Sequence, residues 1–176
     1  NDLTEKYSKL LRHSVAYSDK IIIPLNKELD YIRHYLDIER YRYNDTFDYN
    51  IDIDPGFDRN IGIPKMLLFT FIENAVKHGI KPLSNGGYIQ VKAYRRRKYQ
   101  GVEILDNGVG RAQSAQFKNQ STGSGLKTVD KILDYYREIT GKSIHYEITD
   151  LKDDTDHLTG TKVFLKIPLY GNGSPS

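Results

Sequence analysis

The sequence is without cysteine, and it is also without long apolar runs. The absence of cysteine excludes disulfides, cysteine-ligated zinc and thiol nucleophiles, and it is typical of a protein from a reducing compartment. The apolar runs at 21–25 and 66–72 are far too short to span a bilayer. No signal-peptide pattern opens the chain, so the sequence by itself offers no secretory or membrane-spanning segment.

An excess of charge of one sign is also missing. The chain has 26 Lys and Arg against 23 Asp and Glu, for a formal net charge of +3 over 176 residues. The basic residues are spread along the chain, apart from the run at 95–98, which we interpret as the solvated end of a hairpin. We therefore expect no nucleic-acid partner, and the length predicts one domain with a sizeable core.

The two ends of the chain carry little information about the fold. The start, NDLTEKYSKLLRHS, is helical in pattern and has no initiator Met, as expected for a piece of a longer protein. The end, GNGSPS at 171–176, is typical of a flexible tail. We assign 1–20 to the end of a preceding helical region and 21–170 to the main domain.

Hydrophobic periodicity and turn residues predict the order of helices and strands. Helices are expected at 2–18, at 26–43 with Asn26 as N-cap, at a segment that begins at Pro64 and includes 69–79, and at 125–140. Strands are expected at 46–53, 88–94, 100–105, 143–149 and 161–169. This order predicts an α/β (α+β) two-layer sandwich, in which a mixed sheet has helices on one face and follows a helical lead-in.

The helix at 69–79, FTFIENAVKHG, has the most informative pattern. One side is apolar, and Thr70, Asn74, Lys77 and His78 share another face at helical spacing. Glu73 adjoins Asn74. A face that carries amide, carboxylate, ammonium and imidazole groups predicts a site for a charged, metal-bound ligand.

Three other segments fit the same site. Asp106 opens DNGVG directly after a strand, where a carboxylate can accept a hydrogen bond from an exocyclic amine and glycines allow close approach of the backbone to a flat ring. The run GSGL at 123–126 opens a helix, whose free N–H groups suit a phosphate. Gly160-Thr161 opens the last expected strand. Each segment alone is common in turns and helix entries, so the prediction depends on their order and spacing together.

Several well-known site patterns are absent from the sequence. It has no GxxxxGK(S/T), no HExxH and no GxSxG, and neither Gly-x-Gly run continues as a dinucleotide-binding fingerprint.

The combination closely resembles the GHKL ATP-binding domain of histidine kinases, and more narrowly that of LytS/YehU-type sensor kinases, over nearly the whole chain. IPKMLLFTFIENAVKHG resembles the family's N-box, DNGVG its G1 box, GSGL its G2 box and GTKVFLKIPL its closing strand. The resemblance implies a Bergerat-type sheet, ATP and Mg²⁺ as ligands, Mg²⁺ ligation by Asn74, and a lid at about 111–122. The implied catalytic residues are Glu73 and Lys77. The implied nucleotide-binding residues are Asn74, His78, Asp106, Gly108, Gly110, Gly123, Gly125, Leu126 and Thr161.

Two departures from the wider superfamily affect the expected reaction. Hydrolytic members place a carboxylate four residues before the Mg²⁺-binding Asn, and that position is Thr70 here, so we expect phosphoryl transfer rather than hydrolysis. The family's phosphoacceptor histidine lies in a PHFLFN-like segment, which this sequence does not contain. His13 lies in a helix, but it matches a position that follows the acceptor helix of the family. The acceptor histidine is therefore expected upstream of this sequence.

The resemblance also implies the setting of the domain. The expected partners are a response regulator, of LytTR type by resemblance alone, and a second copy in the full-length protein. The expected location is the cytoplasmic side of a sensor anchored in the inner membrane. A hydrolytic clamp ATPase, a serine-kinase anti-sigma factor and a non-catalytic nucleotide sensor stay open as alternatives.

Overall fold

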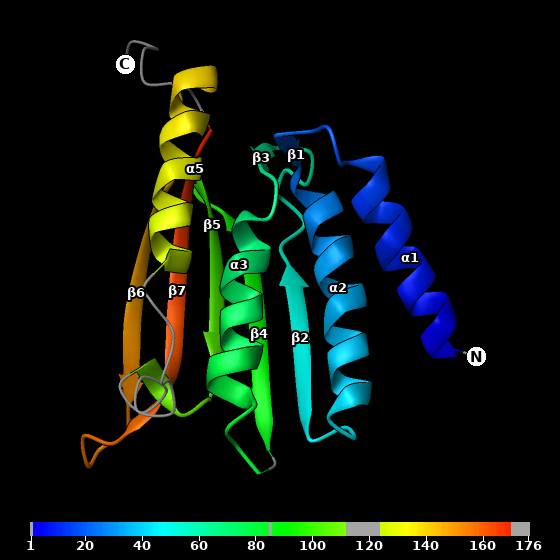
Figure 1. Cartoon of the computed structure of the whole chain (residues 1–176). Coiled ribbons are helices and arrows are strands. Elements are labelled where there is room, and N and C mark those ends of the chain that lie inside the picture. The colour runs from blue at the N-terminus through cyan, green and yellow to red at the C-terminus, as the bar shows by residue number, and fades with distance from the viewer. Residues whose placement is uncertain (1, 85, 112–123, 170–176) are drawn as a thin grey trace.

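A computed structural model describes residues 2–84, 86–111 and 124–169 of the chain. Its elements follow the predicted order (Figure 1). The helices are α1 (Asp2–Ala16), α2 (Leu25–Arg42), α3 (Leu67–Asn74), the π-helical segment η1 (Ala75–Ile80) and α5 (Ser124–Thr140). The strands are β1 (Ile22–Pro24), β2 (Phe47–Ile53), β3 (Gly62–Pro64), β4 (Gly87–Arg95), β5 (Tyr99–Asp106), β6 (His145–Lys152) and β7 (Leu158–Pro168).

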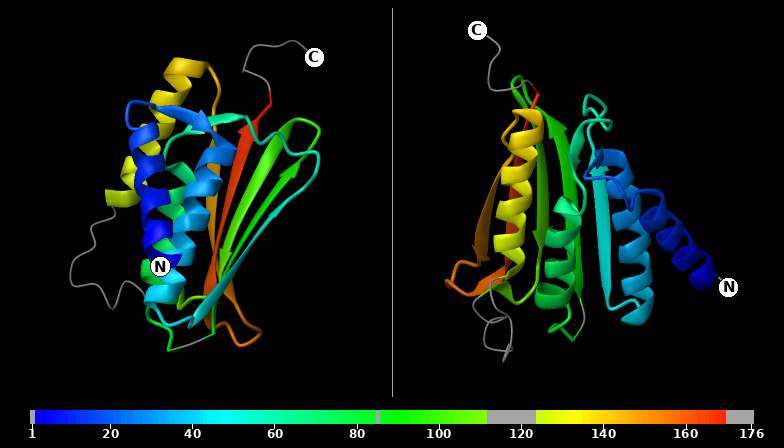
Figure 2. Two further views of the ribbon diagram at one scale, coloured as in Figure 1. Left: turned by 90° about the vertical axis from the view of Figure 1, so that its right-hand side faces the viewer. Right: turned by 45° about the horizontal axis from the view of Figure 1, so that its top comes forward.

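The main sheet has five strands in the order β2-β4-β5-β7-β6. The pair β2 and β4 is parallel and the other pairs are antiparallel, so the sheet is mixed, as predicted. Helices α2, α3 and α5 all cover one face of it (Figure 2). The two-layer α+β sandwich is thereby confirmed.

The core lies between these two layers. Helix α2 contributes Leu29, Ile32 and Leu36, all fully buried, as their helical spacing predicts. Their counterparts on the sheet include Ile89, Val91, Val102, Ile104 and Leu165. Alternate residues of β4 and β5 face the helices and are buried. This packing fixes the two strands and thereby positions the loops that follow their ends.

Two predicted helix starts are wrong. Helix α2 begins at Leu25, with Pro24 rather than Asn26 at its N-cap, because β1 pairs with β3 up to Pro24 and the helix follows at once. The Asn26 Oδ1 is buried and has no hydrogen-bond partner in the described part of the chain. Pro64 belongs to β3, and α3 starts three residues later, after Met66 turns the chain with a positive φ of 68°.

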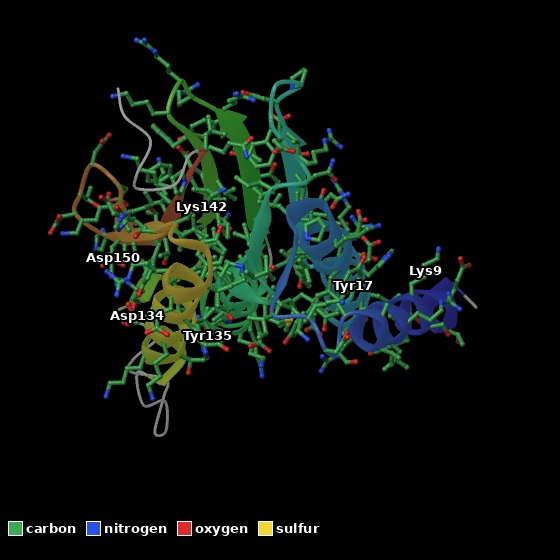
Figure 3. The ribbon with its side chains drawn as sticks, turned by 90° about the horizontal axis from the view of Figure 1, so that it is seen from above. Lys9, Tyr17, Asp134, Tyr135, Lys142 and Asp150 are labelled. Atoms are coloured by element: carbon green, nitrogen blue, oxygen red, sulfur yellow. The ribbon has the colours of Figure 1, made fainter. Side chains whose placement is uncertain are left out.

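The helical lead-in is attached to the main domain. Helix α1 packs along α2, on the side away from α3 (Figure 1). The Lys65 Nζ donates hydrogen bonds to the carbonyl oxygens of Tyr17 and Ser18, at 2.8 and 3.4 Å. Figure 3 shows Tyr17 at the end of α1 that lies close to the rest of the molecule and Lys9 toward the far end. The proposed boundary at residue 20 is therefore bridged by direct contacts, and the proposed tail at 171–176 lies outside the described residues.

Candidate functional site

Three of the four segments singled out in the sequence meet at one end of the sheet. Asp106 ends β5 and lies opposite Thr161 in the ladder with β7. The Val109 N–H donates to the carbonyl of Gly79, at the end of the helix that follows Asn74, over 3.2 Å. The structure therefore brings together the helix, the DNGVG loop and the Gly-Thr pair.

The carboxyl group of Asp106 forms the buried end of this site. Its residue is only 5% exposed, and the Gly108 N–H donates to its Oδ1 over 2.9 Å. Burial raises the pKa of Asp106 to about 6, while the backbone N–H groups of Gly108 and Thr161 oppose the rise. A carboxylate held this way offers acceptor capacity to a donor that enters the site.

Close backbone contacts surround Asp106 and explain two of the glycines. A Cβ at Gly108 would overlap the backbone of Gly79. Gly110 has a positive φ of 75°, and a Cβ there would lie 2.9 Å from the Cβ of Leu158. Both positions therefore need glycine, and they let the loop lie flat against the helix end.

Asn74, Lys77 and His78 lie at the end of α3 and in η1. Asn74 is the last residue of α3 and is half-buried, as is His78. The ammonium of Lys77 pairs with the Glu73 Oε1 over 2.6 Å, so the two predicted catalytic residues contact each other. Lys77 is 53% exposed, which leaves this ion pair open to exchange with a ligand and of little value to stability.

Sequence spacing treated this segment as one regular α-helix, and that assumption is wrong. From Ala75 the chain forms the π-helical η1, in which the Lys81 N–H donates to the Val76 carbonyl five residues earlier. π-Helices occur mostly as single turns inside α-helices, and such turns are frequent at functional sites. The backbone of Gly79, inside η1, lies so close to Asp106 that an added Cβ would be 2.7 Å from the Asp106 Oδ1.

Thr70 cannot replace the carboxylate that hydrolytic relatives carry at this position. Its hydroxyl donates to the Met66 carbonyl over 2.7 Å, inside its own helix. A hydroxyl bonded to the backbone in this way is a poor general base for water.

The predicted phosphate side is described only in part. Gly123 and the residues 112–122 of the expected lid lie outside the described residues. Helix α5 begins at Ser124, with Gly125 as its second residue and Leu126 half-buried near the core. Where the chain leaves the site, the Arg111 guanidinium binds both carboxylate oxygens of Asp150, at 2.7 and 2.9 Å. Thr161 lies inside β7 rather than at its start, because β7 begins at Leu158.

Sequence reasoning missed Asn107 as a structural member of the site. Its Oδ1 accepts a hydrogen bond from the Tyr88 N–H over 2.6 Å, and its Nδ2 donates to the Gly86 carbonyl over 2.9 Å. The amide therefore ties the DNGVG loop to the start of β4. The Asx preference of such turns was the available signal.

The chemistry of the donor set can be compared with what Mg²⁺ needs. Among the described residues no group of three or more His, Asp and Glu side chains is placed to hold a metal. Asn74 offers one amide oxygen, a hard donor, at the C-terminal end of α3. One protein oxygen completed by phosphate oxygens and waters is a normal Mg²⁺ shell, so these residues fit a metal that arrives with a nucleotide.

Comparisons with known proteins show which sequences this chain is similar to. A histidine kinase family model matches residues 1–47. The chain is 28% identical over 167 residues to the sensor histidine kinase YesM of Bacillus subtilis strain 168, covering 94% of this chain and 27% of that protein. It is 28% identical over 177 residues to the sensor protein LytS of Staphylococcus saprophyticus, covering 96% of this chain and 28% of that protein. The chain thus spans about a quarter of the length of these relatives.

Solved structures agree on the fold. The catalytic domain of histidine kinase ThkA has a TM-score of 0.56 at 17% identity, covering 84% of this chain and 95% of that chain. ThkA in complex with the response regulator protein TrrA has a TM-score of 0.53 at 15% identity, covering 95% of this chain and 48% of that chain. No helix in the described part of the chain is long and apolar enough to cross a membrane. The chain is a homologue of the LytS- and YesM-type sensor histidine kinases, and its fold is that of a histidine kinase catalytic domain.

Proposed function

We propose that this chain is the ATP-binding catalytic domain of a two-component sensor histidine kinase. The observation that carries the proposal is the meeting of a buried Asp106 carboxyl with the end of the helix that bears Asn74. A buried hydrogen-bond acceptor and a hard metal-ligating oxygen near one end of the sheet suit a nucleotide with its metal.

The proposed roles follow the chemistry of each residue. Asp106, supported by Thr161, accepts a hydrogen bond from the adenine amino group, and Gly108 and Gly110 line the ring. Asn74 supplies its amide oxygen to Mg²⁺, which neutralises phosphate charge when it is bound. Lys77 and His78 lie toward the phosphates, and Gly123, Gly125 and Leu126 form the opposite side at the N-terminus of α5.

Phosphoryl transfer to a histidine is favoured over hydrolysis because the Thr70 hydroxyl is bonded to the backbone. The residues of this chain then act by positioning the phosphates and compensating their charge, with Lys77 leaving Glu73 for the γ-phosphate. Glu73, once freed, can orient the incoming imidazole. The acceptor histidine is proposed to lie upstream of this sequence.

The partners are proposed at the level that the relatives support. ThkA has been solved with the response regulator TrrA, and we propose a response regulator as the partner here. The LytTR type of regulator, a homodimer and an inner-membrane anchor of the full-length protein are further parts of the same proposal.

The reaction can be tested with the full-length protein and ATP labelled on its γ-phosphate. We expect acid-labile, base-stable label on a histidine. Release of free phosphate without protein label would favour a hydrolytic ATPase instead, and nucleotide binding without either product would favour a non-catalytic sensor.

Asn74→Ala is expected to remove the Mg²⁺-dependent part of nucleotide affinity. Loss of a group that only orients a metal ligand typically lowers metal affinity by roughly ten- to a hundredfold, so loss of the ligand itself should cost at least as much. The measurement is calorimetric titration of a non-hydrolysable ATP analogue with Mg²⁺ and with EDTA. Asn50→Ala, at an exposed position of β2, is the matched control. Equal Mg²⁺ dependence in Asn74→Ala and the unaltered chain would contradict the proposed ligand.

A further inference from the structure

Helix α3 has no capping side chain of its own. Met66 occupies its N-cap with φ 68° and ψ 9° and makes no side-chain hydrogen bond, and the first turn contains no acidic residue. The first N–H groups of a helix have no partner inside the helix and need one from elsewhere. The missing cap therefore has to come from another element.

The cap comes from α2, through Glu28. Its Oε1 accepts a hydrogen bond from the Phe69 N–H over 2.9 Å, across 41 residues of sequence. Glu28 is only 1% exposed, and its Oε2 has no hydrogen-bond partner in the described part of the chain. Burial raises the pKa of Glu28 to about 8, although the backbone N–H groups of Phe69, Leu68 and Met66 act to lower it. Burying a carboxyl group with one oxygen unpaired costs folding free energy. This cost suggests that Glu28 serves a purpose beyond stability.

The same face of α2 also holds the side chain of Phe69. Tyr31 and Tyr35 follow Glu28 by three and seven residues, and so lie on one side of the helix. Their rings meet the Phe69 ring edge-on, with centroids 5.1 and 4.9 Å apart. Phe69 is therefore fixed at its backbone N–H and at its ring, both from α2.

A fixed first turn sets the position of the far end of a short helix. Asn74 lies five residues after Phe69, roughly 7–8 Å along the axis. Helix α3 lies beside α2 in the layer over the sheet (Figure 1). Any shift or rotation of the first turn is carried to Asn74, because the intervening residues form one hydrogen-bonded helix.

We propose that Glu28 is a positioning residue for the nucleotide site, which sets the axial position and rotation of α3 and thereby the placement of Asn74. This role rests on the proposed function. It predicts that Glu28 affects the metal-dependent part of binding more than the part that depends on Asp106, since the backbone of Asp106 is paired with β7 in the sheet.

The test is titration of a non-hydrolysable ATP analogue with Mg²⁺ and with EDTA, at a temperature where every variant is folded. For Glu28→Leu we expect the Mg²⁺-dependent gain in affinity to fall roughly tenfold, as for other residues that orient a metal ligand. Affinity in EDTA should stay within about twofold. Glu28→Gln keeps an oxygen for the Phe69 N–H and should recover most of the gain. The control is Glu147→Leu, at an exposed position of β6.

A role confined to stability would lower the melting temperature and leave both affinities of the folded protein unchanged, and that result would overturn the proposal. If Glu28→Leu does not fold, Tyr35→Leu removes one ring contact to Phe69 and should reduce the same Mg²⁺-dependent gain by a smaller factor. An unchanged Mg²⁺-dependent gain in Tyr35→Leu would then overturn the proposal. Absence of binding by the unaltered chain would instead overturn the proposed function.

Discussion

Asp106→Asn is expected to weaken binding of an ATP analogue by roughly a hundredfold, the usual effect of losing a hydrogen bond to a buried charged group. The amide keeps an oxygen for the Gly108 N–H, so the loop geometry is retained. The NH₂ group of Asn, however, replaces the second carboxylate oxygen. Two hydrogen-bond donors, this NH₂ group and the adenine amino group, would then face each other. Titration at pH 7.5 measures the loss.

The same substitution is expected to make the protein more stable. Burial raises the pKa of Asp106 from 3.8 to about 6, so the folded chain binds a proton more tightly than the unfolded chain. Ionisation above pH 6 therefore costs stability on the order of 1–3 kcal/mol, and that cost disappears as the pH falls toward 3.8. Asn avoids it at neutral pH. Urea unfolding of both proteins between pH 4 and 8 checks the sign.

A control separates this site from any loss of negative charge. Asp52→Asn, at an exposed position of β2, removes one carboxylate far from the loop and should change neither affinity nor stability measurably. Equal affinity of Asp106→Asn and the unaltered chain would show that the nucleotide does not bind at Asp106.

Gly160→Ala should be among the most destabilising substitutions of a small residue in this chain. Gly160 has a φ of 143°, and a Cβ there would overlap the carbonyl oxygen of Asp106. Because that oxygen belongs to the central strand β5, the backbone rather than a side chain has to move. We expect a loss of about 2–4 kcal/mol in the free energy of unfolding, from strain and overlap together.

Urea unfolding measures this loss, and Gly56→Ala is the matched control. Gly56 has no atom within 4 Å of an added Cβ and no positive φ, so its substitution should stay within about 0.5 kcal/mol of the unaltered chain. A Gly160→Ala protein as stable as the control would mean that β7 can shift away from Asp106 without cost.

Local patterns were sufficient for most of the fold and part of the site. Alternation of apolar residues located β2, β4 and β5, and the apolar spacing of α5 together with Gly141, which has a φ of 68°, located that helix and its end. Asp106 and Gly108 of the candidate site could be singled out because they follow a strand in a turn sequence, which depends on only a few neighbouring residues.

The features that escaped prediction depend on contacts between distant residues. Nothing near Met66 indicates that the α3 cap comes from Glu28, and nothing near Pro64 indicates its pairing with Ile22 in a separate two-stranded sheet. The parallel pairing of β2 with β4 likewise follows from packing, since each strand alone is compatible with either direction.

The π-helical turn at Ala75–Ile80 has a consequence for how this chain could have evolved. Such a turn holds one residue more than an α-helix would over the same rise, so it corresponds to a single inserted codon. A deletion there would restore regular hydrogen bonding and give a better helix, yet it would rotate Gly79 away from Asp106. Under the proposed function, ligand binding favours a length that regular helix formation alone would shorten, so this segment should tolerate substitutions far better than single-residue deletions.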